Sequence, residues 1–204
     1  MKTCRSCLLI VLTGLLFASC GTQTIETDLP AGLDPKYSAY SYKAEDREAV
    51  MIVDYEVARL RKEENYFPLD VMIANKKLAS LTITRNSLIL IDSGGKAYNM
   101  AAIDEVQDKY KKLLADSDLK YATFESEQQA MTGFSHFERQ RSNFFPMRAG
   151  GARVTERVIV RPRGYINDRL YFPMPETGIN KQKLTLRLAA AELEVPLEVI
   201  FTVK

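Results

Sequence analysis

The sequence predicts a mainly β fold, an antiparallel β-sheet domain interrupted by a central helical insertion. The last stretch, 195–203, alternates apolar and other residues with the two-residue period of a half-buried strand. Shorter runs of strand type recur between residues 50 and 100 and again after 153, separated by turn residues. The clearest helical spacing of apolar residues lies over 103–114.

The first 19 residues have the pattern of an export signal. Lys2 and Arg5 precede the apolar run Leu8–Phe17, which is half as long as the about 20 residues that a membrane-spanning helix needs. Small residues follow this run and lead to a cysteine. A basic start, a short apolar stretch and small residues before a cleavage site are the marks of a signal peptide.

The run Leu16-Phe-Ala-Ser-Cys20 resembles the lipobox of bacterial lipoproteins, with Phe17 where leucine is usual. This resemblance implies cleavage before Cys20 and acylation of its sulfur, so that lipid chains hold the protein to a membrane. Gly21 follows instead of the aspartate that marks inner-membrane retention. We therefore expect an outer-membrane protein facing the periplasm, or a protein on the cell's outer face if the organism is Gram-positive. An ordinary signal peptide with an incidental cysteine and an uncut anchor are the alternatives.

The composition after cleavage is that of one neutral domain without disulfides. Removing Lys2 and Arg5 from 28 basic residues leaves 26, which equals the number of acidic residues. This balance predicts no nucleic-acid partner. Cys4 and Cys7 also leave with the signal, and acylation uses Cys20. About 185 residues remain, enough for one domain that is stable through its core alone.

Residues 20–44 are predicted to be the lipidated cysteine and a flexible tether, followed by the domain over 45–204. The tether shows no sustained period, and its large side chains are Tyr37, Tyr40 and Tyr42, which we expect to dock on the domain.

The first half of the domain is predicted to contain strands and then helix. The strands are expected at 50–57, 67–74, 81–84, 88–91 and 96–100, with 88–91 covered on both faces because it is continuously apolar. Asp92-Ser-Gly-Gly95 predicts a tight hairpin turn. One helix is expected from the stripe Ile103, Val106, Tyr110, Leu113 and Leu114, and a second from 126, both within an insertion around 101–145.

Strands resume in the second half, at 153–163, 168–172, 183–188 and 195–203. Strands from both sides of the insertion must pair, because neither set completes a sandwich. The pattern "Leu-x-Asp-x-x-Gly-x-x-Tyr", present as Leu90-Ile-Asp92-Ser-Gly-Gly95-Lys-Ala-Tyr98, and the late run Leu170-Tyr-Phe172 resemble elements of immunoglobulin-like domains in small bacterial lipoproteins. The resemblance implies an immunoglobulin-like β-sandwich that acts as a binding or assembly module. It carries no catalytic residues.

No motif predicts catalysis, a metal or a cofactor. The single histidine, His136, follows Ser135, but Phe137 stands where a nucleophile elbow needs glycine. One histidine and no free cysteine after acylation are too few ligands for a typical structural zinc site. Asp116-Ser-Asp118 lacks the glycine and distal glutamate of an EF-hand loop.

A local excess of arginine is the sharpest candidate for a binding surface. Eight arginines lie between 139 and 169, against only two acids, Glu156 and Asp168. If 153–163 is one strand, its alternation places Arg153, Arg157, Arg161 and Arg163 on one face. Arginine suits bidentate capture of phosphate or carboxylate. The alternative is a solvated outer face that the acidic region Glu45–Glu64 balances.

These observations predict a membrane-anchored envelope lipoprotein that acts as a non-catalytic binding or assembly module. Its expected partners are the membrane, through acylated Cys20, and envelope proteins or anionic envelope components, through the arginines. The alternatives are a structural accessory subunit of a larger envelope complex and an envelope hydrolase.

Overall fold

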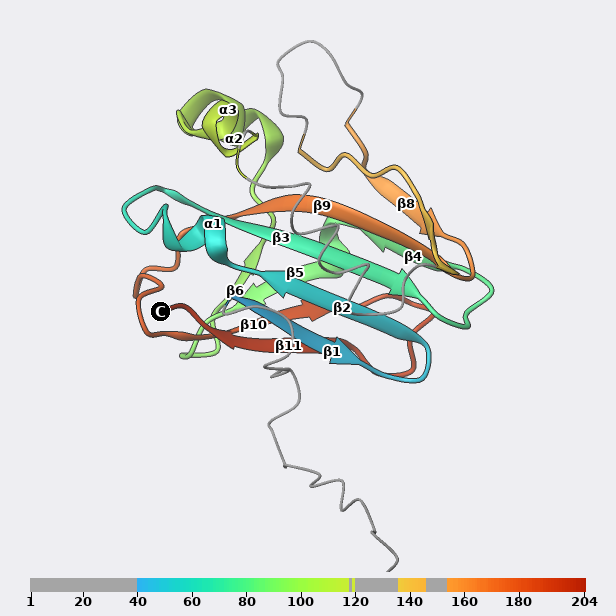
Figure 1. Cartoon of the computed structure of the whole chain (residues 1–204). Helices are drawn as coiled ribbons and strands as arrows, with labels where there is room; N and C mark the ends of the chain where they lie inside the picture. Colours follow the sequence, from blue (N-terminus) through green and yellow to red (C-terminus); the bar gives the residue numbers. More distant parts are fainter. Residues whose placement is uncertain (1–39, 118, 120–135, 146–153) are drawn as a thin grey trace, which may run out of the picture.

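Eleven strands in three sheets dominate the part of the chain that the computed structural model describes, which is residues 40–117, 119, 136–145 and 154–204. Two larger sheets pack face to face, and a two-stranded sheet lies at one end of them (Figure 1). The prediction of a mainly β fold is confirmed.

The larger sheet has five strands, three from the first half of the domain and two from the second. Its spatial order is β1 (Ser41–Glu45), β2 (Ala49–Asp54), β3 (Tyr66–Asn75), β9 (Gly164–Pro173) and β7 (Glu138–Arg139). Neighbours are antiparallel except β7, which runs parallel to β9. A four-residue helix, α1 (Glu56–Arg59), connects β2 to β3.

The second sheet has four antiparallel strands, in the order β11 (Leu197–Thr202), β10 (Lys183–Leu188), β5 (Leu88–Ile91) and β6 (Ala97–Asn99). The two-stranded sheet pairs β4 (Leu81–Thr84) with β8 (Arg157–Val160), and a 3₁₀ turn, η1 (Arg85–Ser87), follows β4.

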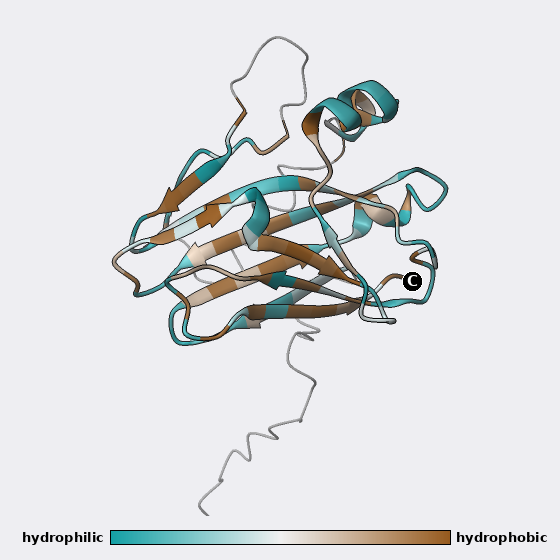
Figure 2. Cartoon of the chain, turned by 180° about the vertical axis from the view of Figure 1, so that it is seen from behind, coloured by the Kyte–Doolittle hydropathy of each residue, from teal (hydrophilic) through white to brown (hydrophobic). Residues whose placement is uncertain are grey.

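The two larger sheets share a core with aromatic rings at its centre. Phe201 on β11 stacks on Phe67 of β3 at 6.4 Å and on Tyr55 at 6.1 Å between ring centroids. All three side chains are almost completely buried. Hydrophobic residues lie along the strands that form this core, and loops are largely hydrophilic (Figure 2). Stacked rings of this size contribute beyond the area they bury.

The continuous apolar run over 88–91 predicts the position of β5 correctly but not its burial. Leu88 and Leu90 are buried, whereas Ile89 and Ile91 are only half-buried, so the prediction of a strand covered on both faces is wrong. Its outer face has no covering layer among the described residues. The hairpin after it forms as predicted, with Gly95 at φ +83°, a value that favours glycine.

The last residues of the predicted tether belong to the sheet. β1 pairs with β2 from Ser41 to Glu45, and the ring of Tyr42 lies 5.9 Å from that of Tyr55. Tyr40 packs edge-on against Tyr55 at 5.6 Å, so both described tyrosines of the tether dock on the domain. The ordered domain therefore begins before residue 45. Residues 20–39, with Tyr37, lie outside the described part of the chain.

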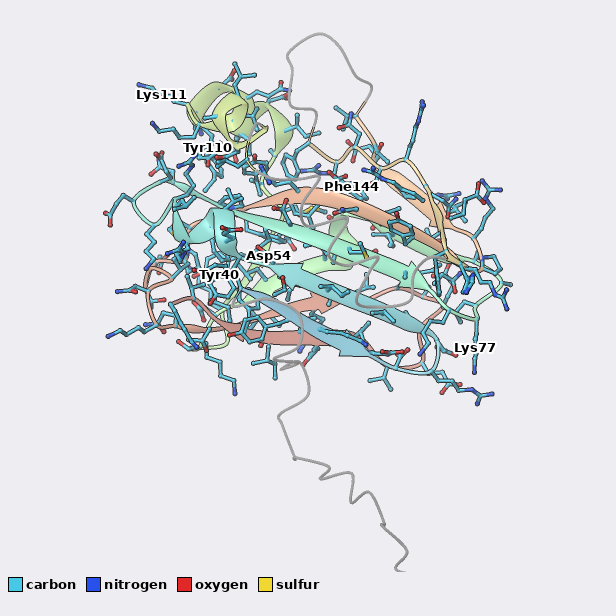
Figure 3. The ribbon with its side chains drawn as sticks, viewed as in Figure 1. Tyr40, Asp54, Lys77, Tyr110, Lys111 and Phe144 are labelled. Atoms are coloured by element: carbon cyan, nitrogen blue, oxygen red, sulfur yellow. The ribbon has the colours of Figure 1, made fainter. Side chains whose placement is uncertain are left out.

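Two short helices stand where one was expected. α2 (Ile103–Lys109) ends at Tyr110, whose ψ of +96° is not helical, and α3 (Leu113–Ser117) follows. The break lets the Tyr110 hydroxyl donate to Asp116 Oδ2 at 2.5 Å while its ring packs on Tyr66. Figure 3 shows Tyr110 beside the two helices. Leu114 is 63% exposed and does not extend the apolar stripe. The helix expected from 126 lies outside the described residues.

A buried ion cluster joins α3 to the outer face of the five-stranded sheet. Arg169 on β9 is fully buried and donates from Nε and Nη2 to the two carboxylate oxygens of Asp70 on β3, at 2.7 and 2.8 Å. The same guanidinium donates to the carbonyl oxygen of Asp116, and Arg61 Nε donates to Asp116 Oδ1 at 2.8 Å. Burial disfavours the charge on Arg169, but the Asp70 carboxylate outweighs it and raises the pKa of the guanidinium.

Replacing Asp70 with alanine should lower the free energy of unfolding by about 3–5 kcal/mol, because Arg169 is then buried without its carboxylate. Urea unfolding measures the loss. The control is Glu105→Ala, which removes an exposed ion pair with Lys109 and should cost less than about 1 kcal/mol. Equal effects of the two substitutions would contradict a structural role for the cluster.

Candidate functional site

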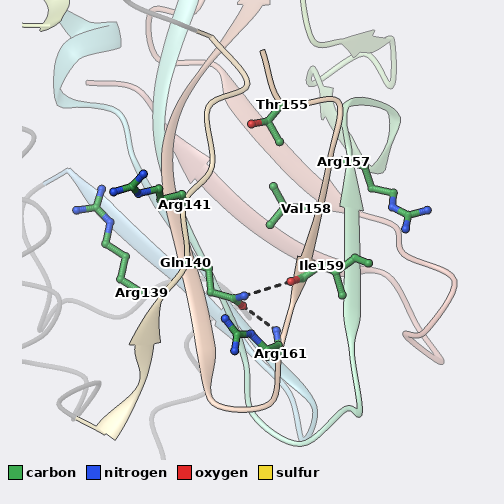
Figure 4. Close-up of a pocket in the computed structure, with 8 residues that line it drawn as sticks. All are labelled: Arg139, Gln140, Arg141, Thr155, Arg157, Val158, Ile159 and Arg161. Carbon is green, nitrogen blue, oxygen red and sulfur yellow. Dashed lines mark hydrogen bonds between the residues drawn. The ribbon is translucent and has the colours of Figure 1, made fainter. Parts of the chain in front are cut away.

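The candidate site is an open groove between β8 and the segment that continues β7. Its volume is about 460 Å³, and four of its eight lining residues are arginines (Figure 4). The lining residues are Arg139, Gln140, Arg141, Thr155, Arg157, Val158, Ile159 and Arg161. No carboxylate is among them.

One wall of the groove is the segment 138–145, which is fastened along β9. The Gln140 N–H donates to the carbonyl oxygen of Tyr165 at 2.7 Å, and the Phe144 N–H donates to Asp168 Oδ2 at 2.8 Å. Phe144 and Phe145 are buried and end the segment in the core. Bonds at both ends therefore hold Arg139 and Arg141 against the sheet.

Arg85 strengthens this anchor instead of facing a ligand. Its Nη1 donates to the Phe144 carbonyl oxygen at 2.7 Å, and a second nitrogen donates to the Ala101 carbonyl. The guanidinium carbon lies 4.5 Å from the ring centroid of Phe145, a cation–π contact. Burial lowers the pKa of Arg85, and the charges of Glu156 and Asp168 offset this effect only in part.

The other wall is β8 and the turn that follows it. Val158 and Val160 point into the core, whereas Arg157 and Ile159 are exposed, as the period of a strand requires. After Val160 the chain turns sharply, and the Gly164 N–H donates to the Arg161 carbonyl oxygen at 2.8 Å. This turn ends β8 because Arg163 adopts a φ of +55°, which is not an extended conformation.

Gln140 bridges the two walls with its side-chain amide. Its Oε1 accepts from the Arg161 N–H at 2.7 Å, and its Nε2 donates to the Ile159 carbonyl oxygen at 3.3 Å (Figure 4). The amide reaches this place because residue 164 is glycine. A Cβ there would lie 2.5 Å from Gln140 Oε1 and 2.9 Å from the Arg161 carbonyl oxygen.

The structure assembles a different set of arginines from the predicted one. Arg157 and Arg161 line the groove, Arg163 is exposed in the turn outside it, and Arg153 lies outside the described residues. The interpretation of 153–163 as a single strand is wrong, because β8 covers only Arg157–Val160. The turn over Pro162 therefore removes Arg163 from the strand's alternation.

In the observed groove, Arg139 and Arg141 take the place of Arg153 and Arg163 from the predicted set. Both come from the arginine-rich region but were not assigned to the predicted face. Their spacing of two residues was the available signal, since it places both on one side of an extended segment. Figure 4 shows them pointing to the same side, with Arg161 beside Gln140.

The charge of the groove comes from three of its four arginines. The Arg157 side chain points away from Arg139 and Arg141 in Figure 4. On that side, an H-bond from Thr82 and, to a smaller extent, the charge of Arg157 lower the pKa of Glu192. Within the described chain, neither Arg141 nor Arg161 forms an ion pair. A groove with this charge and no carboxylate in its lining favours an anionic ligand.

The other residues singled out in the sequence do not extend this site. Cys20 and Ser135 lie outside the described residues, and His136 is exposed. Among the residues that are described, no three histidine, cysteine or acidic side chains are placed to hold a metal ion. No helix in the same part of the chain has the length and apolarity to cross a bilayer.

Comparison of the chain with family models, curated proteins and solved structures gives no match. The assignment of the site rests on the geometry and charge of the groove.

Asp168, which anchors the arginine-bearing segment, should make stability depend on pH. Burial raises its pKa to about 6, although H-bonds from Phe144 and Ser142 act in the opposite direction. The unfolded chain releases this proton near pH 3.9, so between about pH 4 and pH 6 the folded state binds more protons. The stability that Asp168 contributes is complete below pH 4 and is lost as the pH rises through 6.

Asp168→Asn should therefore flatten the fall in unfolding free energy between about pH 4 and pH 6, because asparagine does not titrate. Urea unfolding at a series of pH values measures the difference between variant and parent. Glu138→Gln, an exposed substitution in the same segment, should leave the profile unchanged. If the unfolding free energies of Asp168→Asn and the parent changed in parallel with pH, the raised pKa of Asp168 would be contradicted.

Proposed function

We propose that this protein is a membrane-anchored envelope lipoprotein and a non-catalytic binding module, with the arginine groove as the site for an anionic partner. The observation that carries the proposal is that Arg139, Arg141 and Arg161 line one open groove with no carboxylate in its lining. Two of them are held on a segment fastened to β9. The main chain that carries these two arginines therefore needs little ordering on binding.

The proposed location rests on the resemblance of Leu16–Cys20 to a lipobox. Acyl chains on Cys20 would fix the domain to a membrane, since two or more chains together give a stable anchor. With Gly21 next, the outer membrane is the proposed site, with the domain in the periplasm, or the outer cell face in a Gram-positive organism. Anions at hand there are lipid phosphates, peptidoglycan carboxylates and acidic proteins.

An immunoglobulin-like topology is part of the proposal, and the strand order supports it. Immunoglobulin domains place strands A, B and E side by side in one sheet and C, F and G in the other. Here β2, β3 and β9 are neighbours in the first sheet, and β5, β10 and β11 are neighbours in the second. β6 then takes the place of C′. A fold of this kind does not by itself assign a partner.

The accessory-subunit alternative is favoured by a second surface. A cleft of about 670 Å³ lies between β1 and the approach to β11, lined in part by Lys43, Arg187 and Val195. The Val195 side chain is 69% exposed. A protein with two contact surfaces suits a larger assembly, and co-extraction from the envelope at fixed stoichiometry would support this role.

Reversing two groove charges tests the binding function. The double variant Arg139→Glu/Arg161→Glu, in the full-length protein in detergent micelles, should bind poly-L-glutamate and inorganic polyphosphate at least about tenfold more weakly, because attraction becomes repulsion. Microscale thermophoresis measures the affinity. The control, Lys111→Glu/Lys183→Glu, makes the same charge change at two exposed residues outside the groove lining, and Figure 3 shows Lys111 beside the short helices. Equal losses of affinity in the two double variants would show that net charge, and not the groove, determines binding.

Cys20→Ala tests the anchor. The variant should move from the membrane fraction to the soluble fraction, because the acyl chains have no attachment site. Fractionation followed by immunoblotting measures the distribution, and Cys7→Ala in the signal is the matched control. Unchanged sedimentation of the Cys20 variant would refute the lipid anchor.

A further inference from the structure

The edge of β8 that faces away from β4 is the second feature of the groove. The Thr82 N–H donates to Glu192 Oε1 and the Thr84 N–H to Ser87 Oγ, both at 3.1 Å. These two residues of β4 therefore point their main-chain groups away from β8. In an antiparallel pair, residues whose N–H and C=O groups point outward form no main-chain hydrogen bonds with the residues opposite them.

The residues opposite Thr84 and Thr82 are Arg157 and Ile159. Their N–H and C=O groups consequently point away from β4, toward the groove. The two bonds from Gln140 agree with this direction, because they use the Ile159 carbonyl oxygen and the Arg161 N–H. Strand β8 thus presents a main-chain edge to the same space as the arginines.

Part of this edge has no hydrogen-bond partner among the described residues. Gln140 occupies one end, and at the other end the Thr155 N–H donates to the Asn143 carbonyl oxygen at 2.8 Å. Between them, within the described chain, no group bonds to the N–H or C=O of Arg157 or to the N–H of Ile159. The open stretch offers two donors and one acceptor.

We propose that the groove binds a short acidic segment of a partner protein in extended form. The segment pairs its main chain with Arg157 and Ile159 and places its carboxylates near Arg139, Arg141 and Arg161. Addition of a strand to a free sheet edge is an established mode of peptide recognition. This inference rests on the proposed function and names the partner of that site.

The acceptor on this edge favours a peptide over a simple anion. The Arg157 carbonyl oxygen carries partial negative charge and needs a donor, which a carboxylate or a fully ionised phosphate group lacks. A peptide supplies an N–H for that oxygen, C=O groups for the two N–H donors and side-chain carboxylates for the arginines. The groove volume of about 460 Å³ suits a segment of a few residues.

Two N-methylated isomers of one peptide test the main-chain pairing. The probe is a dye-labelled peptide of alternating glutamate and alanine, and the isomers carry methyl groups on one or the other set of alternate nitrogens. Since alternate N–H groups of a strand point to the same edge, only one isomer should lose affinity, by at least about tenfold. Fluorescence anisotropy with the full-length protein in detergent micelles measures binding.

A pair of substitutions tests the same edge from the protein side. Ile159→Pro removes the N–H that faces the groove and no ladder bond to β4, whereas Ile159→Ala keeps it. The proline variant should bind the peptide at least about tenfold more weakly than the alanine variant. Circular dichroism and thermal melting check that both variants fold. If the proline variant does not fold, the methylated peptides alone test the strand pairing.

The possible outcomes separate this inference from the proposed function. Equal binding of both isomers, with binding still lost in Arg139→Glu/Arg161→Glu, would overturn the strand pairing and leave an anion site. Binding to phosphatidylglycerol vesicles or peptidoglycan fragments, but not to the peptide, would overturn the acidic protein segment as partner. If Arg139→Glu/Arg161→Glu bound every probe with the affinity of the parent protein, the proposed function would be overturned as well.

Discussion

The buried pairing of Arg169 with Asp70 is the interaction on which the arrangement of the domain depends. It lies on the outer face of the five-stranded sheet, and the same guanidinium bonds to the main chain at Asp116, so one side chain joins two strands to α3. Buried charges are tolerated only when each is paired. Next to Arg169, Asp168 holds the arginine-bearing segment, so β9 supports both the helices and the groove.

The sequence could predict the strands whose two faces differ in polarity. β10 and β11 show the two-residue period because one face is buried and the other half-exposed. β1 escapes detection because its only buried apolar residues are Tyr42 and Ala44. The break at Tyr110 was equally hidden, since an unbroken stripe cannot show that a tyrosine hydroxyl will turn toward Asp116.

The candidate site could be predicted only as a region. An excess of arginine is visible in the sequence, but Arg85 and Arg169 are structural, and only contacts distant in sequence reveal this. Parallel pairing of β7 with β9 brings Arg139 and Arg141 to the groove, and no local pattern encodes that pairing. The positive φ of Arg163 similarly decides which arginines stay on the strand.

A strand edge that is partly open is a place where identical molecules can polymerise. The amide of Gln140 covers the Ile159 carbonyl of β8 and the Arg161 N–H in the turn after it, as a neighbouring strand would. A second copy that approached edge to edge would bring its own Arg139, Arg141 and Arg161 against the same charges, and the repulsion opposes stacking. That repulsion would oppose the growth of edge-to-edge chains of identical domains.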